Sequence, residues 1–324
     1  MKKILFRCDS SSTIGLGHVK RCLVLAKRLE EQNKDLHIAF STLDLKGNIN
    51  QEILKNGFVI YFLKDTNVNF LNDILKKQGI DFLIIDSYDI DDVFEKNIKS
   101  KNQKLKILSF DDTLKTHNVD IVLNHGIQAQ RSAYKKLVSK ECKVLCGSKY
   151  TLLRDEFFKN YKTKIKKDSV AIILGGNDVL NLSSKIADYL LKLNNNYKIS
   201  IITSKVNIHQ KELKQKKGVE ILIDIDNIAE VLSSKDFVIT ASGGTLFEVL
   251  ALKKRFINID VVENQKVVTD FLKENSIKTT IKADKLSLKK LREKIEYIEK
   301  TNIYEKIDLK FSKNKLIKKI LKEL

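Results

Sequence analysis

The chain opens with the stretch Lys3-Ile-Leu-Phe-Arg-Cys-Asp-Ser-Ser-Ser-Thr-Ile-Gly-Leu-Gly-His-Val-Lys-Arg-Cys-Leu-Val-Leu-Ala-Lys-Arg-Leu29. Its apolar run Ile4-Leu-Phe6 suits a buried strand of a parallel sheet, and apolar residues recur at helical spacing from Val19 to Leu29. Two glycines separate these segments. The pattern therefore predicts a strand, a glycine-rich loop and a helix.

His18 stands at the predicted start of this helix, directly after Gly17. In open α/β sheets ligands bind beyond the carboxyl ends of the strands, and a helix N-terminus offers unpaired N–H groups to an anion. Gly15, Gly17 and His18 are therefore candidate site residues. The alternative is that the glycines only form a tight turn and that His18 only begins the helix.

Two familiar phosphate-binding loops do not fit this stretch. A dinucleotide fingerprint requires a third glycine where Lys20 stands, and an acid after the second strand, which here ends in Ser41-Thr42. A Walker loop requires Gly-Lys-Ser or Gly-Lys-Thr, whereas His18 follows the second glycine. We expect neither an NAD site nor a P-loop, and no cofactor.

The composition indicates a globular protein of two α/β domains. A chain of 324 residues suits two domains of about 150 residues each. Mean hydropathy is −0.23, and no apolar run approaches the length of a membrane span. No secretory signal precedes Arg7 and Asp9, and the four cysteines lack zinc-site spacing. We expect a cytoplasmic protein, a monomer, with reduced thiols, no metal and no membrane partner.

The formal net charge of +19 raises the question of nucleic-acid binding. Arginine supplies only seven of the 60 basic residues, although base readout relies on arginine forks. Aromatic residues are not interleaved with basic ones on predicted strands, as a stacking platform would require. The lysines instead cover predicted solvent faces, as at 313–322, where an apolar face predicts an amphipathic helix. We expect no nucleic-acid partner.

Strands and helices alternate along the chain, which is typical of a parallel sheet covered on both faces. The expected strands after the first cover residues 36–40, 59–63, 82–85, 106–109, 121–123 and 143–145, then 170–174, 199–203, 219–223, 237–240 and 256–259. The lysine-rich segment 159–167 interrupts the apolar pattern and is the expected linker. We therefore expect domains over residues 1–158 and 159–324.

Polar residues follow two strands of the first half. Asp86 and Tyr88 come just after one buried strand, and Asp112 follows the next. Asp89-Ile-Asp91 resembles the acid-x-acid pair that holds a metal in one class of sugar-nucleotide transferases. We favour the alternative that these acids stabilise a helix start, where each contributes about 0.3 to 1 kcal/mol.

The second half carries its own glycine loops. Gly175-Gly176 follows its first strand, and Gly243-Gly244-Thr245 precedes another predicted helix, where N–H groups and a hydroxyl would face a diphosphate. Glu248 falls one helical turn later, placed to accept hydrogen bonds from ribose hydroxyls. The alternative is a plain turn with a first-turn acid. The segment Val262-Glu263-Asn264-Gln265 places polar groups at a further strand-to-helix junction.

Taken together, two Rossmann-like halves with these loops resemble the GT-B architecture, two domains with a cleft between them. Across nearly the whole chain, the motifs also resemble the UDP-sugar hydrolases of pseudaminic acid biosynthesis. The matching motifs are Phe6-Arg7-Cys-Asp9-Ser-Ser-Ser, Ile14-Gly-x-Gly17-His18-x-x-Arg21, Ile85-Asp86-x-Tyr88, Ser109-Phe-Asp-Asp112, Leu153-Arg154-x-Glu156-Phe157 and Glu263-Asn264-Gln265.

The resemblance implies metal-independent hydrolysis of UDP-2,4-diacetamido-2,4,6-trideoxy-β-L-altrose at its anomeric carbon. By that similarity His18 matches the catalytic base, and Tyr88 and Asn264 match residues near the sugar. Arg154 and Glu248 match contacts to the substrate nucleotide. The Gly243-Gly244 pair departs from the family, which has serine-rich variants of this loop, but it keeps the pattern of a phosphate-binding loop. The substrate-binding set is Gly15, Gly17, Arg154, Gly175, Gly176, Gly243, Gly244, Thr245, Glu248 and Gln265.

The chemistry of the residues supports the same reaction. UDP leaves as a stabilised anion, so one base that activates water suffices, and water attacking opposite UDP would invert the anomeric carbon. Two alternatives remain: a GT-B glycosyltransferase that passes the sugar from a UDP-sugar to an acceptor, and a non-catalytic protein that binds a sugar nucleotide or polyanion.

Overall fold

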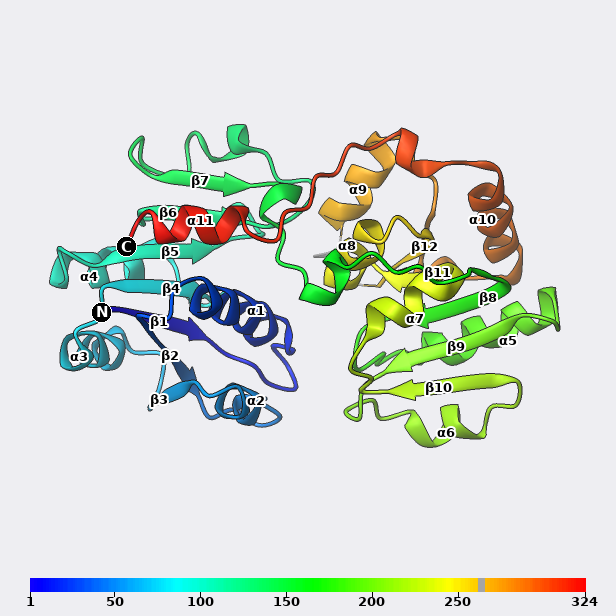
Figure 1. Cartoon of the computed structure of the whole chain (residues 1–324), viewed down its shortest axis with the longest axis horizontal. Helices are drawn as coiled ribbons and strands as arrows, with labels where there is room; N and C mark the ends of the chain where they lie inside the picture. Colours follow the sequence, from blue (N-terminus) through cyan, green and yellow to red (C-terminus); the bar gives the residue numbers. More distant parts are fainter. Residues whose placement is uncertain (262–265) are drawn as a thin grey trace. The chain divides into compact units, whose positions relative to one another are not determined.

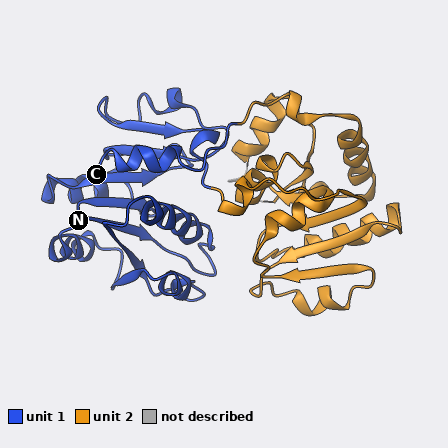
Figure 2. Ribbon diagram, viewed as in Figure 1, with its two compact units in different colours: residues 1–152, 310–324 blue, residues 153–309 orange. Residues whose placement is uncertain are grey.

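The computed structural model describes residues 1–261 and 266–324 and divides into two compact units. Unit 1 contains residues 1–152 and 310–324, and unit 2 contains residues 153–309 (Figure 2). Across the described residues, no helix has the length and apolar character that crossing a membrane requires.

Unit 1 is built on a seven-stranded sheet with the strand order β3-β2-β1-β4-β5-β6-β7, all paired in parallel (Figure 1). The strands are β1 (Lys2–Cys8), β2 (Leu36–Leu43), β3 (Val59–Leu63), β4 (Phe82–Asp86), β5 (Lys106–Phe110), β6 (Ile121–Asn124) and β7 (Lys143–Cys146). The helices of this unit are α1 (Gly17–Gln32), α2 (Asn50–Lys55), α3 (Val68–Gln78), α4 (Asp92–Lys101) and α11 (Lys315–Leu321), with the 3-10 turn η1 (Arg131–Tyr134) after β6.

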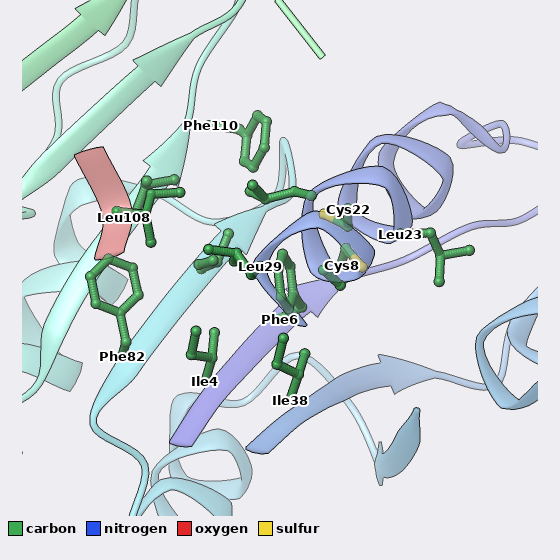
Figure 3. Close-up of a cluster of buried hydrophobic side chains, with 14 of the residues drawn as sticks. Ile4, Phe6, Cys8, Cys22, Leu23, Leu29, Ile38, Phe82, Leu108 and Phe110 are labelled. Carbon is green, nitrogen blue, oxygen red and sulfur yellow. The ribbon is translucent and has the colours of Figure 1, made fainter. Parts of the chain in front are cut away.

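The middle of β1, Ile4–Phe6, is apolar because both faces of this sheet are covered. Ile4 and Phe6 belong to the core beneath α1, whereas Leu5 belongs to the core on the opposite face. Figure 3 shows Phe6 lying close to Leu29 of α1, in the same buried cluster. Full burial of a large apolar side chain contributes about 1.5 to 3 kcal/mol, so this packing fixes α1 over β1.

The C-terminal helix corrects the expected domain division. Residues 310–324 were expected to close the second domain, but they belong to unit 1. Leu316, Ile317 and Ile320 of α11 are buried in the same core as α1 and β1. The apolar face of this lysine-rich helix was correctly predicted, but the sequence pattern carries no information on which sheet it covers.

Unit 2 is built on a six-stranded parallel sheet with the order β10-β9-β8-β11-β12-β13. Its strands are β8 (Lys166–Ile173), β9 (Lys198–Thr203), β10 (Val219–Ile223), β11 (Lys235–Ala241), β12 (Arg255–Asp260) and β13 (Thr280–Lys282). Its helices are α5 (Leu182–Leu193), α6 (Gln210–Gln215), α7 (Ile228–Ser234), α8 (Gly244–Ala251), α9 (Lys266–Glu274) and α10 (Leu288–Lys300), with the turn η3 (Asp155–Phe158) at its start.

Each sheet has one point where the strand order reverses. In unit 1 this point lies between β1 and β4, and in unit 2 it lies between β8 and β11. The loops that leave neighbouring strands at such a point run to opposite faces of the sheet, which opens a crevice at the carboxyl ends. The glycine loops after β1, β8 and β11 all begin at these reversal points.

Candidate active site

The loop after β1 places His18 in the first turn of α1. Gly15 has a φ of +86°, a conformation that a side chain would strain, and the backbones of Ser11 and Gly15 bond to each other across the turn. Helix α1 then begins at Gly17 without a capping side chain. The turn thus reverses the chain from β1 into α1 and points His18 toward the end of β4.

His18 pairs there with a buried carboxylate. Its Nδ1 lies 2.6 Å from Oδ1 of Asp86, the last residue of β4, and both side chains are buried. Burial opposes ionisation of Asp86, but Arg21 and then His18 hold its pKa well below the usual range. Nη2 of Arg21 lies 3.1 Å from the same nitrogen, but the shorter contact with an ionised acceptor favours the imidazole proton on Nδ1 and the basic lone pair on Nε2.

Arg21 lies one helical turn after His18 and braces the same carboxylate. Its Nε and Nη2 each donate to Asp86 at 2.5 Å. Burial disfavours the guanidinium charge, yet Asp86 and then Asp112 raise the pKa of Arg21 above its usual range. The guanidinium also lies 5.0 Å from the centre of the Phe110 ring. Arg21 therefore fixes the carboxylate that orients His18.

Tyr88 stands edge-on to the imidazole. The rings of His18 and Tyr88 are 4.7 Å apart at 83°, and the Tyr88 hydroxyl donates to Oδ2 of Asp112 at 3.0 Å. Partial burial and then Asp112 raise the pKa of Tyr88, so the phenol is neutral at physiological pH. Asp112 also accepts from Nη1 of Arg21 at 3.2 Å. The structure thus brings the candidate residues His18 and Tyr88 together.

His125 also contacts this group of residues, although the sequence pattern did not single it out. Its Nε2 lies 2.9 Å from Nη1 of Arg21 and accepts from it. Burial and then the charge of Arg21 lower the pKa of His125 to about 4, so this imidazole is neutral. It directly follows β6, and the rule that sites form beyond strand ends would have found it.

The acidic pair after β4 has a structural role in part. Asp91 is the N-cap of α4 and accepts from the backbone N–H of Phe94 at 2.8 Å, which is the favoured alternative of the sequence analysis. Within 1–261 and 266–324, no three His, Cys, Asp or Glu side chains are grouped as a metal site would need.

In unit 2, backbone conformation and close packing explain why glycine stands at Gly175 and Gly176. Gly175 has a φ of +88°, which favours glycine. A Cβ on Gly176 would come within 2.9 Å of Oγ of Ser204, which donates to the Gly176 carbonyl at 2.8 Å. These glycines let the loop after β8 turn tightly against the loop after β9.

Neither backbone conformation nor close packing requires glycine at the second pair, Gly243 and Gly244. Gly243 and Gly244 do not have positive φ, and a Cβ on either would meet no atom within 4 Å. Gly243 caps α8 without a side-chain hydrogen bond, and Thr245 follows in the first turn. Open space beside bare backbone at a helix start is what the approach of an anionic ligand requires.

Arg154 and Glu248 bind each other. Nε and Nη2 of Arg154 donate to the two carboxylate oxygens of Glu248 at 2.9 and 3.1 Å. Burial opposes the charge, but Glu248 raises the pKa of Arg154. The sequence suggested two separate substrate contacts, whereas the structure joins Arg154, at the start of η3, to Glu248 of α8 in one bidentate pair. Asn264 and Gln265 lie outside the described residues.

No protein-family model matches the chain. Among curated proteins, it is 38% identical over 275 residues to the UDP-2,4-diacetamido-2,4,6-trideoxy-β-L-altropyranose hydrolase of Campylobacter jejuni subsp. jejuni serotype O:2, covering 83% of this chain and 96% of that protein. It is also 31% identical over 277 residues to an uncharacterized protein of Methanocaldococcus jannaschii, covering 80% of this chain and 55% of that protein.

Solved structures share the fold at low sequence identity. MurG of Acinetobacter baumannii matches with a TM-score of 0.67 and 12% identity over 99% of this chain and 100% of that one. The S. aureus MnaA–UDP co-structure matches with a TM-score of 0.61 and 13% identity over 99% and 95%. The expected GT-B fold is therefore confirmed. Because the 38% identity extends over nearly all of the Campylobacter protein, the chain belongs to the family of UDP-2,4-diacetamido-2,4,6-trideoxy-β-L-altropyranose hydrolases.

Proposed function

We propose that this protein hydrolyses UDP-2,4-diacetamido-2,4,6-trideoxy-β-L-altrose at its anomeric carbon, releasing UDP and the free sugar for pseudaminic acid biosynthesis. The family supports the substrate class. The single observation that carries the mechanism is the 2.6 Å contact of His18 Nδ1 with Asp86. A general base oriented by a buried carboxylate is a recurrent arrangement for activating a hydroxyl or water.

In the proposed reaction, Nε2 of His18 takes a proton from water as the water oxygen bonds to the anomeric carbon. The bond from that carbon to the UDP oxygen breaks, and its electron pair leaves with the β-phosphate. Asp86 stabilises the imidazolium, which then returns its proton to solvent. UDP is a stable anion, so no metal and no second acid are needed, and a single displacement inverts the carbon.

Tyr88 is proposed to contact the sugar. Its O–H bond is directed to Asp112, so its phenolic oxygen presents lone pairs, and an acetamido N–H is a suitable donor to them. The resemblance to the family supports Asn264 as a second residue near the sugar and Gln265 as a substrate contact.

The loops of unit 2 are proposed to bind the UDP moiety. The bare backbone of Gly243 and Gly244 and the hydroxyl of Thr245 suit the diphosphate, since they open α8 with space beside them. Glu248, held by Arg154, would accept hydrogen bonds from the ribose.

The test is to incubate the protein with the UDP-diacetamido sugar, with EDTA and without an acceptor. We expect UDP release, and proton NMR in the first minutes should show the inverted anomer before mutarotation. His18→Asn should lower kcat by about 10² to 10⁴-fold and leave UDP affinity unchanged in calorimetry. Equal turnover of variant and parent, or early accumulation of the retained anomer, would overturn the base mechanism.

A GT-B glycosyltransferase is the second candidate, because solved structures that share this fold include glycosyltransferases. It would release UDP only when an acceptor alcohol is added. Turnover that depends on an acceptor would therefore favour this function, and UDP-sugar binding without any turnover would favour a non-catalytic binding protein.

A further inference from the structure

Unit 1 contains a second buried charged cluster that the proposed mechanism does not use. It consists of Glu95 on α4, Asp111 after β5, His117 before β6 and Tyr134 on η1, none more than 7% exposed. His117 lies between the two acids. Its Nδ1 is 2.8 Å from Glu95, its Nε2 is 3.7 Å from Asp111, and the Tyr134 hydroxyl donates to Asp111 at 2.8 Å.

The contacts between His117 and Asp111 favour the charged forms of both residues. Burial alone would lower the pKa of His117, but Asp111 and Glu95 together raise it to about 9. Burial likewise opposes ionisation of Asp111, while His117 and the Thr113 N–H bring its pKa to about 2. Buried ion groups of this kind seldom improve on apolar packing for stability alone, and their best-attested use is to specify one geometry.

The geometry that they specify is that of the segment 111–118. Asp111 accepts from the backbone N–H groups of Thr113 and Lys115 at 2.8 and 3.2 Å. At the other end, the N–H of His117 donates to Leu137, and the N–H of the following residue donates to Glu95 at 2.7 Å. The segment is thus fastened to α4 and to its own first residue.

Two residues of this fastened segment reach the proposed active site. Asp112 accepts from the Tyr88 hydroxyl at 3.0 Å and from Arg21 at 3.2 Å. Lys115 donates from Nζ to the Tyr88 carbonyl at 2.6 Å, and its ammonium lies 6.0 Å from the Tyr88 ring. Tyr88 is 44% exposed, so these contacts rather than core packing hold its ring against His18.

We propose that Glu95, Asp111 and His117 form a positioning clamp for the active site: they fix the segment 111–118 so that Asp112 and Lys115 hold Tyr88 edge-on to His18. The assignment of a catalytic effect rests on the proposed function. His117 and Glu95 act only through other residues and touch neither the base nor its orienting acid.

The test uses His117→Gln and the milder Glu95→Gln, with Asp120→Asn as the matched control. Asp120 also ties β5 to β6, accepting from the Ile107 N–H at 2.9 Å, but it does so at the amino end of β6, away from Tyr88. Loosening the clamp should lower kcat by about 10- to 100-fold with little change in UDP affinity. The control should lose stability without losing kcat below its melting temperature.

A second readout does not depend on turnover. The chain has five histidines, so the imidazole NMR signals can be assigned by single substitutions. The clamp predicts that Glu95→Gln, which keeps a hydrogen-bond acceptor and is the variant expected to fold, shifts the His18 signals, whereas Asp120→Asn does not. Unchanged His18 signals in folded Glu95→Gln, or a kcat no lower than in Asp120→Asn, would overturn the clamp. A parent protein that fails to hydrolyse the sugar nucleotide would overturn the proposed function, and the NMR comparison would still decide the clamp.

Discussion

His18 and Asp86 are 68 residues apart in the sequence, yet Nδ1 of one lies 2.6 Å from Oδ1 of the other. The parallel register explains this distance, because β1 and β4 are neighbours and Cys8 is paired with Asp86. Helix α1 begins shortly after β1, so its first turn stands over the end of β4. The pair therefore depends on the reversal of strand order between β1 and β4.

This relationship predicts the effect of Asp86→Asn. An asparagine amide can donate to Nδ1 of His18 and so favour the wrong tautomer, and it carries no charge to stabilise the imidazolium. We expect kcat to fall by about 10² to 10⁴-fold, with UDP affinity unchanged. Steady-state kinetics and calorimetry with UDP measure the two effects.

Asp81→Asn is the control for this variant. Asp81 directly precedes β4 and accepts from the Lys3 N–H at 2.8 Å, so it ties the same two strands at their amino ends. Its replacement should reduce stability but not kcat. If the two variants lose the same activity, Asp86 serves only to hold the sheet.

Local sequence patterns predicted the position of His18 after β1 and at the start of α1. The apolar run before Gly15 and the helical period after Gly17 could only place His18 at a strand-to-helix turn. The partner of His18 could not be predicted from its own surroundings, since the pairing depends on which strands are neighbours. His125 could have been found as the residue directly after β6, but its contact with Arg21, 104 residues away, depends on long-range packing.

Two features of the fold were beyond the sequence pattern. Strand β13 has only three residues, Thr280–Lys282, too few to show an alternation. Helix α11 has a clear apolar face, but it packs in the core of unit 1 because the chain leaves unit 2 after Leu309 and rejoins unit 1 at Lys310. Periodicity identifies elements and their buried faces, whereas long-range packing decides what covers them.

A second prediction concerns Gly244→Ala. Alanine is a better helix former than glycine, and its Cβ would meet no protein atom within 4 Å, so stability should be unchanged or slightly higher. If the diphosphate approaches this backbone, the added methyl group should weaken UDP binding by about 1 to 2 kcal/mol. The melting temperature should therefore stay the same or rise, whereas the UDP affinity measured by calorimetry should fall.

Gly218→Ala provides the opposite case in the same unit. Gly218 has a φ of +75° and lies at the amino end of β10, away from the strand ends that carry the loops. A side chain there costs about 1 kcal/mol of stability and should leave UDP affinity intact. Unchanged UDP affinity in Gly244→Ala would remove the second glycine loop from the proposed nucleotide site.

A third prediction concerns the pair of Arg154 and Glu248. Glu248→Ala removes the acceptor proposed for the ribose and should weaken UDP by roughly 1 to 3 kcal/mol. Glu156→Ala is the matched control, because Glu156 also lies 3.3 Å from Nη1 of Arg154 but is not on α8. Equal losses of UDP affinity would show that both acids act by positioning Arg154.

The last prediction concerns stability against pH. The pKa of His117 is raised to about 9 in the folded protein, above the value of about 6.5 expected when unfolded. Protonated His117 therefore stabilises the folded protein fully below pH 6.5, and this contribution is lost as pH rises through about 9. The pKa of Asp111 is lowered to about 2 in the folded protein. Its contribution to stability is therefore present at any pH above its unfolded pKa and is lost only as pH falls toward 2.

Lys254 acts in the opposite direction over the same alkaline range. Burial lowers its pKa to about 8, so between pH 8 and its unfolded value near 10.4 the unfolded chain binds more protons and stability rises with pH. The melting temperature of the parent alone therefore mixes the two effects. Subtracting the denaturation free energy of His117→Gln, measured at pH 6, 8 and 10, cancels the lysine and isolates the histidine. The difference should be largest at pH 6 and shrink by pH 10, because only the protonated imidazole bridges Glu95 and Asp111. A difference that stays constant with pH would mean that His117 is held by packing and not by its charge.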